Sequence, residues 1–228
     1  MNIYFLVEGD TEEKVYKAWL KYLLPELTRI GLPHQVDHNN YYLFNAKGQP
    51  GIIDRHLPDA IANIQEYSKY NYLVICLDAE EVTIDYKEQE IYKCLKSNNI
   101  DLVNIQFHII IQNRCFDTWC LGNKGIYPLQ PEISPLLDYT NYYDVSLNCP
   151  EIMGKLHFNT HAQFHKDYLR ELFKINNLKH YKITNEVIKE EYLEQLIARV
   201  QNETEHLPTF QTFIQFCNMI KSKLSKQL

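Results

Sequence analysis

Glycine is scarce in this sequence, with 7 among 228 residues, and neither an internal repeat nor a low-complexity tract occurs. These absences exclude a collagen-like or low-complexity chain. Aromatic residues make up 13% of the chain, and 17 residues are tyrosine, a composition typical of a globular protein. A chain of this length can bury a sizeable core, as one large α/β domain or as a domain of about 150 residues with a helical extension.

Several motifs are also absent. Six cysteines are present, but no two have the Cys-x-x-Cys spacing, which argues against a zinc knuckle. No Walker A loop and no three-glycine nucleotide fingerprint occurs, so ATP hydrolysis by this chain is not expected. No signal peptide or membrane-length apolar run is found, because Asn2 and Glu8 interrupt the N-terminus. We therefore expect a cytoplasmic protein with reduced thiols and no membrane partner.

The net charge of −6 is unevenly distributed along the chain. Residues 1–150 hold 12 Lys and Arg against 20 Asp and Glu, which is −8, whereas residues 151–228 hold 11 against 9, which is +2. An acidic first part favours a cation-binding cluster over a bare nucleic-acid surface. The overall acidity also argues against strong independent affinity for nucleic acid, so a partner would deliver such a substrate.

Apolar runs and helical patterns alternate along the first part of the chain. The apolar runs predict strands at residues 3–7, 41–44, 72–77 and 103–111. The helical patterns between them cover residues 11–30, with a kink or break at Pro25, and residues 52–68 and 86–97. Continuous apolarity is typical of strands covered on both faces. The order predicts a Rossmann-like α/β fold with a mostly parallel sheet flanked by helices.

The remainder of the chain has a different character. Four prolines punctuate residues 123–150, which predicts a loop-rich insertion or lid. Helical patterns follow at residues 160–175, 185–204 and 208–226. We therefore expect an α/β core over residues 1–122 and, over residues 123–228, a loop-rich insertion with a helical C-terminal extension packed on that core.

An acid ends the first predicted strand. Glu8 precedes Gly9, which permits a tight turn before a helix that Asp10 or Thr11 can cap. Glu12 and Glu13 lie in the first turn of that helix, where acids suit the helix dipole. Helix capping explains Glu13 and is one explanation of Glu12, but it does not explain Glu8, which lies before the cap.

Two further predicted strands also end in carboxylates. Asp78 and Glu80 follow residues 72–77, and Asp117 lies just beyond residues 103–111. Because the C-terminal ends of parallel strands lie at one edge of a sheet, these acids are expected to meet Glu8 there. Unpaired, they would repel one another, and a bound Mg²⁺ or Mn²⁺ would relieve that cost. Asp78 and Glu80, two residues apart on an extended strand end, would form a metal clamp.

These residues resemble the two sequence motifs of the Toprim domain of topoisomerases, primases and overcoming-lysogenization-defect nucleases. Residues 7–12 are Val-Glu-Gly-Asp-Thr-Glu, and residues 77–80 are Leu-Asp-Ala-Glu. Residues 113–119 and 206–213 are similar to later motifs of small standalone bacterial Toprim-like proteins, whose function is unassigned. The resemblance covers residues 1–122 by motif and the C-terminal segment only loosely.

The resemblance implies roles for individual residues. Glu8 would act as general acid or base, and Asp78 with Glu80 would bind Mg²⁺. Glu80 stands where the family has a second Asp, so its side chain is one methylene longer and the geometry of the ion would differ. In the nuclease branch, Glu12 resembles a second metal-binding acid, and Asp117 matches a later one.

Several cationic or imidazole side chains are candidates for substrate binding. Arg114 either orients a phosphate or pairs with Asp117, and Lys166 is another candidate contact to phosphate. His157, His161 and His165 recur every four residues, but Asn159 and Thr160 predict a helix start that removes His157 from that row. For the other two histidines, a solvated or core-edge position competes with phosphate binding, and core packing is favoured for Trp119.

The sequence leads to one main hypothesis and two alternatives. The main one is a Mg²⁺-dependent Toprim-type nuclease that cleaves DNA or RNA phosphodiesters in bacterial anti-phage defence, with Glu8 and Asp78 as the catalytic residues. The first alternative is a non-catalytic Toprim-fold partner of an ATPase subunit, and the other is a further phosphoryl transfer such as nucleotidyl transfer. The defence setting and the ATPase partner are implied by the resemblance alone, and an oligomer is compatible with all three.

Overall fold

The computed structural model describes residues 1–48, 51–128, 131–175 and 183–226. The chain divides into two compact units. The first comprises residues 1–77, 83–111 and 216–228, and the second comprises residues 78–82 and 112–215. This boundary differs from the predicted division at residue 122, because the chain leaves the first unit at residue 112 and returns to it for its final residues.

A five-stranded parallel sheet in the order β2-β3-β1-β4-β5 forms the centre of the first unit. Its strands are β1 (Asn2–Val7), β2 (Thr28–Ile30), β3 (Asn40–Asn45), β4 (Tyr72–Asp78) and β5 (Gln106–Gln112). In the middle strand, Val7 lies opposite Asn45 of β3 and Cys76 of β4. All six residues of β1 are buried, as expected for a strand covered on both faces. The predicted α/β fold is thus confirmed.

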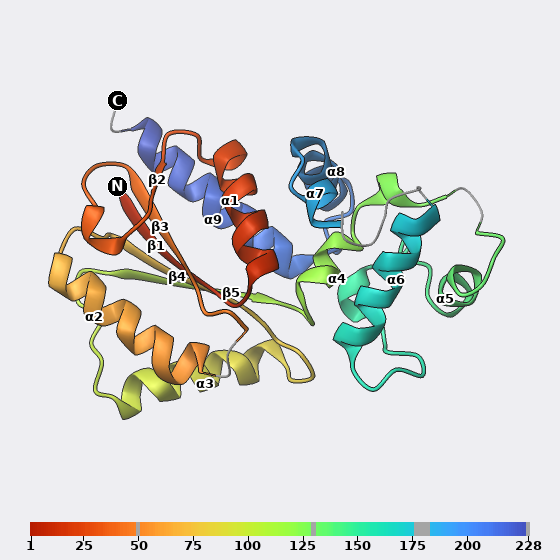
Figure 1. Cartoon of the computed structure of the whole chain (residues 1–228), viewed down its shortest axis with the longest axis horizontal. Coiled ribbons are helices and arrows are strands. Elements are labelled where there is room, and N and C mark those ends of the chain that lie inside the picture. Colours follow the sequence, from red (N-terminus) through yellow and green to blue (C-terminus); the bar gives the residue numbers. More distant parts are fainter. Residues whose placement is uncertain (49–50, 129–130, 176–182, 227–228) are drawn as a thin grey trace. The chain divides into compact units, whose positions relative to one another are not determined.

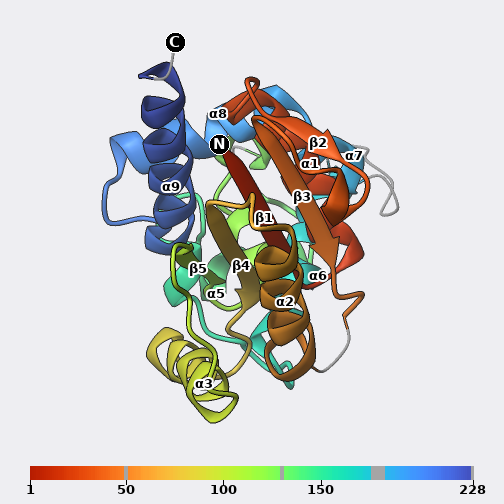
Figure 2. The same cartoon turned by 90° about the vertical axis from the view of Figure 1, so that its left-hand side faces the viewer.

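Helices cover both faces of this sheet. They are α1 (Asp10–Leu23), α2 (Leu57–Tyr67), which follows the π-helical turn η2 (Ile52–His56), α3 (Ile84–Ser97), and the end of α9 (Pro208–Ser225). Figure 1 shows α2 and α3 on one side of the sheet and α1 with the end of α9 on the other; Figure 2 shows the same division. Phe5 of β1 contacts the ring of Phe216 in α9, whereas the neighbouring Tyr4 faces α2. Alternate side chains of one strand therefore build both layers.

The predicted helix over residues 11–30 is confirmed as far as Leu23 and is wrong beyond that residue. The helix α1 ends at Leu23, and residues 28–30 form the edge strand β2, which pairs with β3 and is followed by a short 3₁₀ turn, η1 (Pro33–Gln35). Pro25 has no N–H to donate and its ring clashes with the preceding turn, so it ends the helix instead of kinking it. Leu27 fits the apolar spacing of a helix because it is buried, although it is not part of a helix.

The second unit is built from short elements and three longer helices. These are α4 (Phe116–Cys120), η3 (Lys124–Ile126), α5 (Leu136–Tyr142), η4 (Pro150–Ile152), α6 (His161–Ile175), α7 (Ile183–Val187), α8 (Glu190–Asn202) and the first part of α9. The predicted helix over residues 185–204 is therefore broken in two. Within the part of the chain that the structure describes, no helix is sufficiently long and apolar to cross a membrane.

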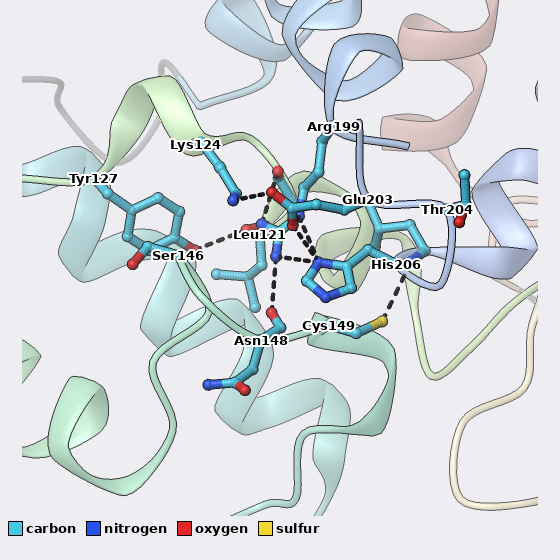
Figure 3. Close-up of polar contacts among 12 residues, drawn as sticks. Leu121, Lys124, Tyr127, Ser146, Asn148, Cys149, Arg199, Glu203, Thr204 and His206 are labelled. Carbon is cyan, nitrogen blue, oxygen red and sulfur yellow. Dashed lines mark hydrogen bonds and ion pairs between the residues drawn. The ribbon is translucent and has the colours of Figure 1, made fainter. Parts of the chain in front are cut away.

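The loop-rich segment of the second unit is held by a buried arginine (Figure 3). Arg199 of α8 is 3% exposed and donates to the carbonyl oxygens of Gly122, at 3.0 Å, and Asn148, at 2.8 Å. Its Nη2 lies 3.0 Å from Nδ1 of His206, which in turn lies 2.6 Å from a carboxylate oxygen of Glu203. One side chain thus fastens two loops and the segment before α9 to α8.

Candidate functional site

Two segments at strand ends are joined by backbone hydrogen bonds within the second unit. Ala79, just after β4, donates its N–H to the carbonyl of Gln112 at 2.9 Å, and Glu80 donates to the carbonyl of Arg114 at 2.7 Å. The Arg114 guanidinium also donates two hydrogen bonds to this segment, to the carbonyl oxygens of Glu80 at 3.3 Å and Val82 at 3.1 Å. These bonds fix residues 78–82 beside residues 112–114. Arg114 therefore holds this loop, a role different from the phosphate contact or the pairing with Asp117 predicted for it.

The charges of two of the predicted acids act on one buried thiol. Burial raises the pKa of Cys115 well above its usual value, and the negative charges of Asp117 and then Asp78 raise it further. Both carboxylates must therefore lie within electrostatic range of the same sulfur atom, although 39 residues separate them in the sequence. The backbone bonds of Ala79 and Glu80 place the end of β4, with Asp78, beside the segment that leads into α4, which carries Asp117 in its first turn.

Cations of α6 face Asp117. Burial raises the pKa of this carboxyl group, while the charges of Lys166 and Arg170 act in the opposite direction. Lys166 is exposed, and Arg170 also pairs with Asp167, with 2.7 Å between Nη1 and Oδ1. An acid beside two cations can bind either a metal ion or, through the cations, a phosphate group. Lys166 is the one of the predicted substrate contacts that is both exposed and close to an acid of the site.

The predicted clamp of Asp78 and Glu80 does not form on an extended strand. The strand ends at Asp78, and Glu80 has a left-handed backbone with φ of +55° and an exposed side chain. The alternation that would place two residues of an extended strand on the same side therefore stops before Glu80. The next acid, Glu81, accepts the backbone N–H of His161 at 2.7 Å and forms an ion pair with Lys155 at 3.6 Å.

The histidines of α6 have structural partners. His161 Nδ1 lies 3.0 Å from the Glu81 carboxylate. His165 is fully buried, with Nδ1 2.7 Å from Thr118 Oγ1, and burial lowers its pKa to about 4. Its assignment as a substrate contact is therefore corrected, since no substrate at the surface can reach it. His157 lies before α6 and stacks on Phe158, as the predicted helix start required.

The first unit places Glu8 and Glu12 around the turn into α1. Glu8 directly follows β1 and is half-buried, and its carbonyl accepts the N–H of Gly48 at 2.7 Å. The Glu12 side chain folds back over Gly9, because a Cβ built on this glycine would lie 2.8 Å from Glu12 Oε2. The charge of Glu12 also contributes, after burial, to raising the pKa of Cys76 in β4 to about 12. Glu12 is thus half-buried, and its charge acts on the thiol of Cys76.

Other acids at this turn behave differently from the prediction. The N-cap is Gly9, not Asp10 or Thr11, and no side chain caps α1. Glu13 does lie in the first turn, where an acid favours the helix dipole, but its carboxylate also pairs with Arg29 at 2.7 Å and accepts from Asn45 at 3.0 Å. Glu13 thus has a structural role that joins α1 to β2 and β3.

The donor set suits a hard cation with few protein ligands. Among the described residues, no group of three or more His, Cys, Asp or Glu side chains is arranged to hold a metal ion. Mg²⁺ commonly uses only one or two carboxylates and completes its shell with water and phosphate oxygens. Asp78 and Asp117 each supply a carboxylate of this kind, on segments of the second unit that backbone hydrogen bonds hold together.

Sequence reasoning missed several residues of this region, although most adjoin a predicted one. Thr118 and Glu81 each follow a predicted acid, and Arg170 lies four residues after Lys166 on one helix face, a spacing that could have identified it. No family model, curated protein or solved structure matches the chain. The Toprim resemblance therefore remains an expectation based on short motifs.

Proposed function

We propose that this chain is a Mg²⁺-dependent nuclease that hydrolyses nucleic-acid phosphodiesters. The observation that carries the proposal is the pairing of two acid-bearing segments in one unit: backbone hydrogen bonds join the residues after Asp78 to residues 112 and 114, which lead into the helix that carries Asp117. Both acids come at or just after the C-terminal ends of strands, where open α/β sheets bind their ligands. Lys166 adds an exposed cation beside Asp117, as required to meet a phosphate group.

The residues would divide the work as follows. Asp78 and Asp117 would hold a divalent ion, which would supply charge neutralisation at the phosphate and a lowered pKa of water. Lys166 binds a non-bridging phosphate oxygen as a point charge. Arg114 holds residues 78–82 through its two carbonyl contacts and so keeps Asp78 in place. Proton transfer by Glu8 is the role that the Toprim resemblance implies.

Cleavage assays with Asp78→Asn and Asp117→Asn test the proposal. The parent should cut single-stranded DNA, duplex DNA or RNA with added Mg²⁺ or Mn²⁺ and lose this activity in EDTA. Each variant should lose on the order of 100-fold or more in rate, because an amide is a poor ligand for a hard cation. Asp138→Asn, at an exposed acid of α5 in the same unit, is the matched control and should cut as the parent does. Full activity in both site variants would show that the assigned chemistry is wrong.

A non-catalytic partner of an ATPase is the second candidate. It is favoured by the charges of Lys166 and Arg170 at Asp117, since cations close to a carboxylate compete with a metal ion. Calorimetric titration with Mg²⁺ and Mn²⁺ separates the two candidates. Binding that disappears in Asp78→Asn supports the nuclease, whereas the absence of any Asp78-dependent binding supports the partner.

A further inference from the structure

A pocket of about 400 Å³ opens between the sheet and α2, entirely within the first unit. Tyr4 of β1 and Phe44 of β3 supply the sheet side, and Asp59 and Asn63 supply the helix side. His56, the last residue of η2, lies at the junction of the two. The volume is within the range of small-molecule sites in proteins, which combine aromatic walls with a few polar groups.

Rigid elements position the polar groups of this pocket. Asp59 and Asn63 are four residues apart on α2, so they share one face of the helix. Burial, the largest effect, raises the pKa of Tyr4 above its ordinary value, the charge of Asp59 raises it further, and hydrogen bonding by Asn63 acts in the opposite direction. Among the lining residues, Tyr4 is buried, with 1% of its surface exposed, whereas Asp59 is exposed.

Aromatic rings form the apolar part. The ring centroids of Phe44 and His56 lie 5.2 Å apart with an interplanar angle of 44°. Both residues are half-buried and line the pocket. The π-helical turn that presents His56 follows Gly51, whose φ of +122° is disfavoured for residues with a side chain. Such irregular turns are frequent at functional sites.

The charges of the residues that line the pocket restrict the kinds of ligand that it can bind. Of the residues described as lining the pocket, Asp59 carries a full negative charge, and none is Lys or Arg. A phosphate or carboxylate ligand would therefore meet a negative charge with nothing to offset it. A flat ligand that offers several N–H donors at one edge would instead satisfy the Asp59 carboxylate and pack its face on Phe44.

We propose that this pocket binds a guanine base. Guanine presents two adjacent N–H donors, at N1 and N2, which match the two oxygens of one carboxylate, and its O6 accepts a bond from an amide such as that of Asn63. Phe44 and His56 supply the ring face on which a base stacks. Adenine presents an unprotonated ring nitrogen in the place of the N1 donor and would be repelled by Asp59. The proposal does not depend on the nuclease assignment.

Ligand-detected NMR and calorimetry with guanosine, inosine and adenosine test this site on the full chain. Guanosine should bind, inosine should bind about tenfold more weakly because it lacks the N2 donor, and adenosine should bind more weakly still. Asp59→Asn and Phe44→Leu should each weaken guanosine binding about tenfold or more. Asp54→Asn removes an acid of η2 that does not line this pocket and should leave the affinity unchanged.

Circular dichroism and thermal unfolding would show that each variant is folded. Guanosine binding that follows the expected order, is lost in Asp59→Asn and is retained in Asp54→Asn supports the proposal. Three results would overturn it: no guanosine binding to the parent at millimolar concentration, equal affinity for adenosine, or full affinity in Asp59→Asn. Preferential binding of spermidine, included as an organic cation, would also overturn it, because Asp59 and Phe44 would then serve a charged amine.

Discussion

The two units differ in how many polar side chains they bury. Among the described residues, the buried polar side chains of the first unit are Asn2 and Asn40, and the Asn2 side chain accepts the Asn40 backbone N–H at 2.9 Å. The second unit buries a longer series: Gln112, Thr118, Asn123, Glu151, His165, Arg199 and Thr209. The first unit is thus stabilised chiefly by apolar burial, whereas the second relies on satisfied hydrogen bonds as well.

This difference has physical consequences. An apolar core loses stability in proportion to the volume removed, and its stability responds little to pH. A buried polar network depends on each partner, because the loss of one group leaves another buried without a hydrogen bond. The second unit should therefore be more sensitive to single polar substitutions and to protons. The second unit also contains Asp78 and Asp117, so the charges within it directly affect the proposed binding of a metal ion.

The largest expected effect is in the buried network of the second unit. Arg199→Leu should lower the free energy of unfolding by about 3–5 kcal/mol, since the carbonyl oxygens of Gly122 and Asn148 would lose their buried donor. Urea unfolding measures this loss. Lys124→Met, which removes an exposed partner of Glu203, is the control and should cost about 1 kcal/mol or less. A loss below about 1 kcal/mol for Arg199→Leu would remove the contrast between the units.

The apolar core of the first unit should give a comparable but pH-independent loss. Leu6 in β1 is fully buried, so Leu6→Ala should lower the free energy of unfolding by about 2–5 kcal/mol through lost burial and a residual cavity. Urea unfolding at several pH values tests both points. Leu32→Ala, at a side chain that is 49% exposed, is the control and should cost far less. A strong pH dependence of the Leu6→Ala loss would contradict the distinction.

Two buried groups of the second unit should oppose each other as the pH falls. Burial raises the pKa of Glu151 from 4.5 to about 7, against the bonds that Thr209 donates to its carboxylate. Between these values the folded chain holds a proton that the unfolded chain has released, so Glu151 adds stability as the pH falls from 7 to 4.5. Burial lowers the pKa of His165 from 6.5 to about 4. Here the unfolded chain binds the proton, so stability is lost as the pH falls from 6.5 to 4.

Each contribution is on the order of 3 kcal/mol over its range, so the two should largely cancel between pH 4.5 and 6.5. Glu151→Gln should unmask a loss of stability on acidification, and His165→Gln should unmask a gain. Urea unfolding across this range measures both slopes, and the double variant is the control, with neither slope. Identical slopes in the two single variants would show that these groups do not control the pH response.

The smallest effect is expected at the surface of the second unit. Burial acts to raise the pKa of Glu81, but the bonds from His161 and the charge of Lys155 outweigh it and lower the pKa overall. The Glu81 side chain is 39% exposed, so solvent screens the pair, and His161→Ala should cost about 1 kcal/mol or less. The loss should shrink in high salt and as the pH falls and protonates Glu81. A large, salt-independent loss would place His161 with the buried network.

Local sequence patterns predicted the strands and helices of the first unit correctly where all local preferences favoured the same element. The apolar run at residues 72–77 lies in β4, and the helical pattern at residues 86–97 lies in α3. The prediction failed at β2, a strand of three partly exposed residues whose formation depends on pairing with β3. Pairing partners far along the chain leave no local periodicity, so this strand could not be found from its own residues.

The sequence predicted where the residues of the candidate site lie along their helices and strands, but not how deeply each is buried or what it contacts. Spacing along α6 indicated that His161 and His165 share a helical face, yet one bonds an exposed acid and the other is buried against Thr118. Periodicity identifies the face of a helix but not the depth of each residue on it. Periodicity also failed to predict the backbone of Glu80. This residue has a left-handed conformation, and its N–H donates to the carbonyl of Arg114, which is distant in the sequence.

The sequence by itself determined the α/β architecture and the acids at or after strand ends, because both follow from apolar runs and the residues that terminate them. The tertiary structure alone decided that the segment after Asp78 and the segment before Asp117 are joined by hydrogen bonds, that His165, Glu151 and Arg199 are buried, and that Tyr4, Phe44 and Asp59 line one pocket. These outcomes depend on which distant segments exclude water from one another. Burial sets the cost of each charge and the strength of each hydrogen bond, and no local pattern encodes it.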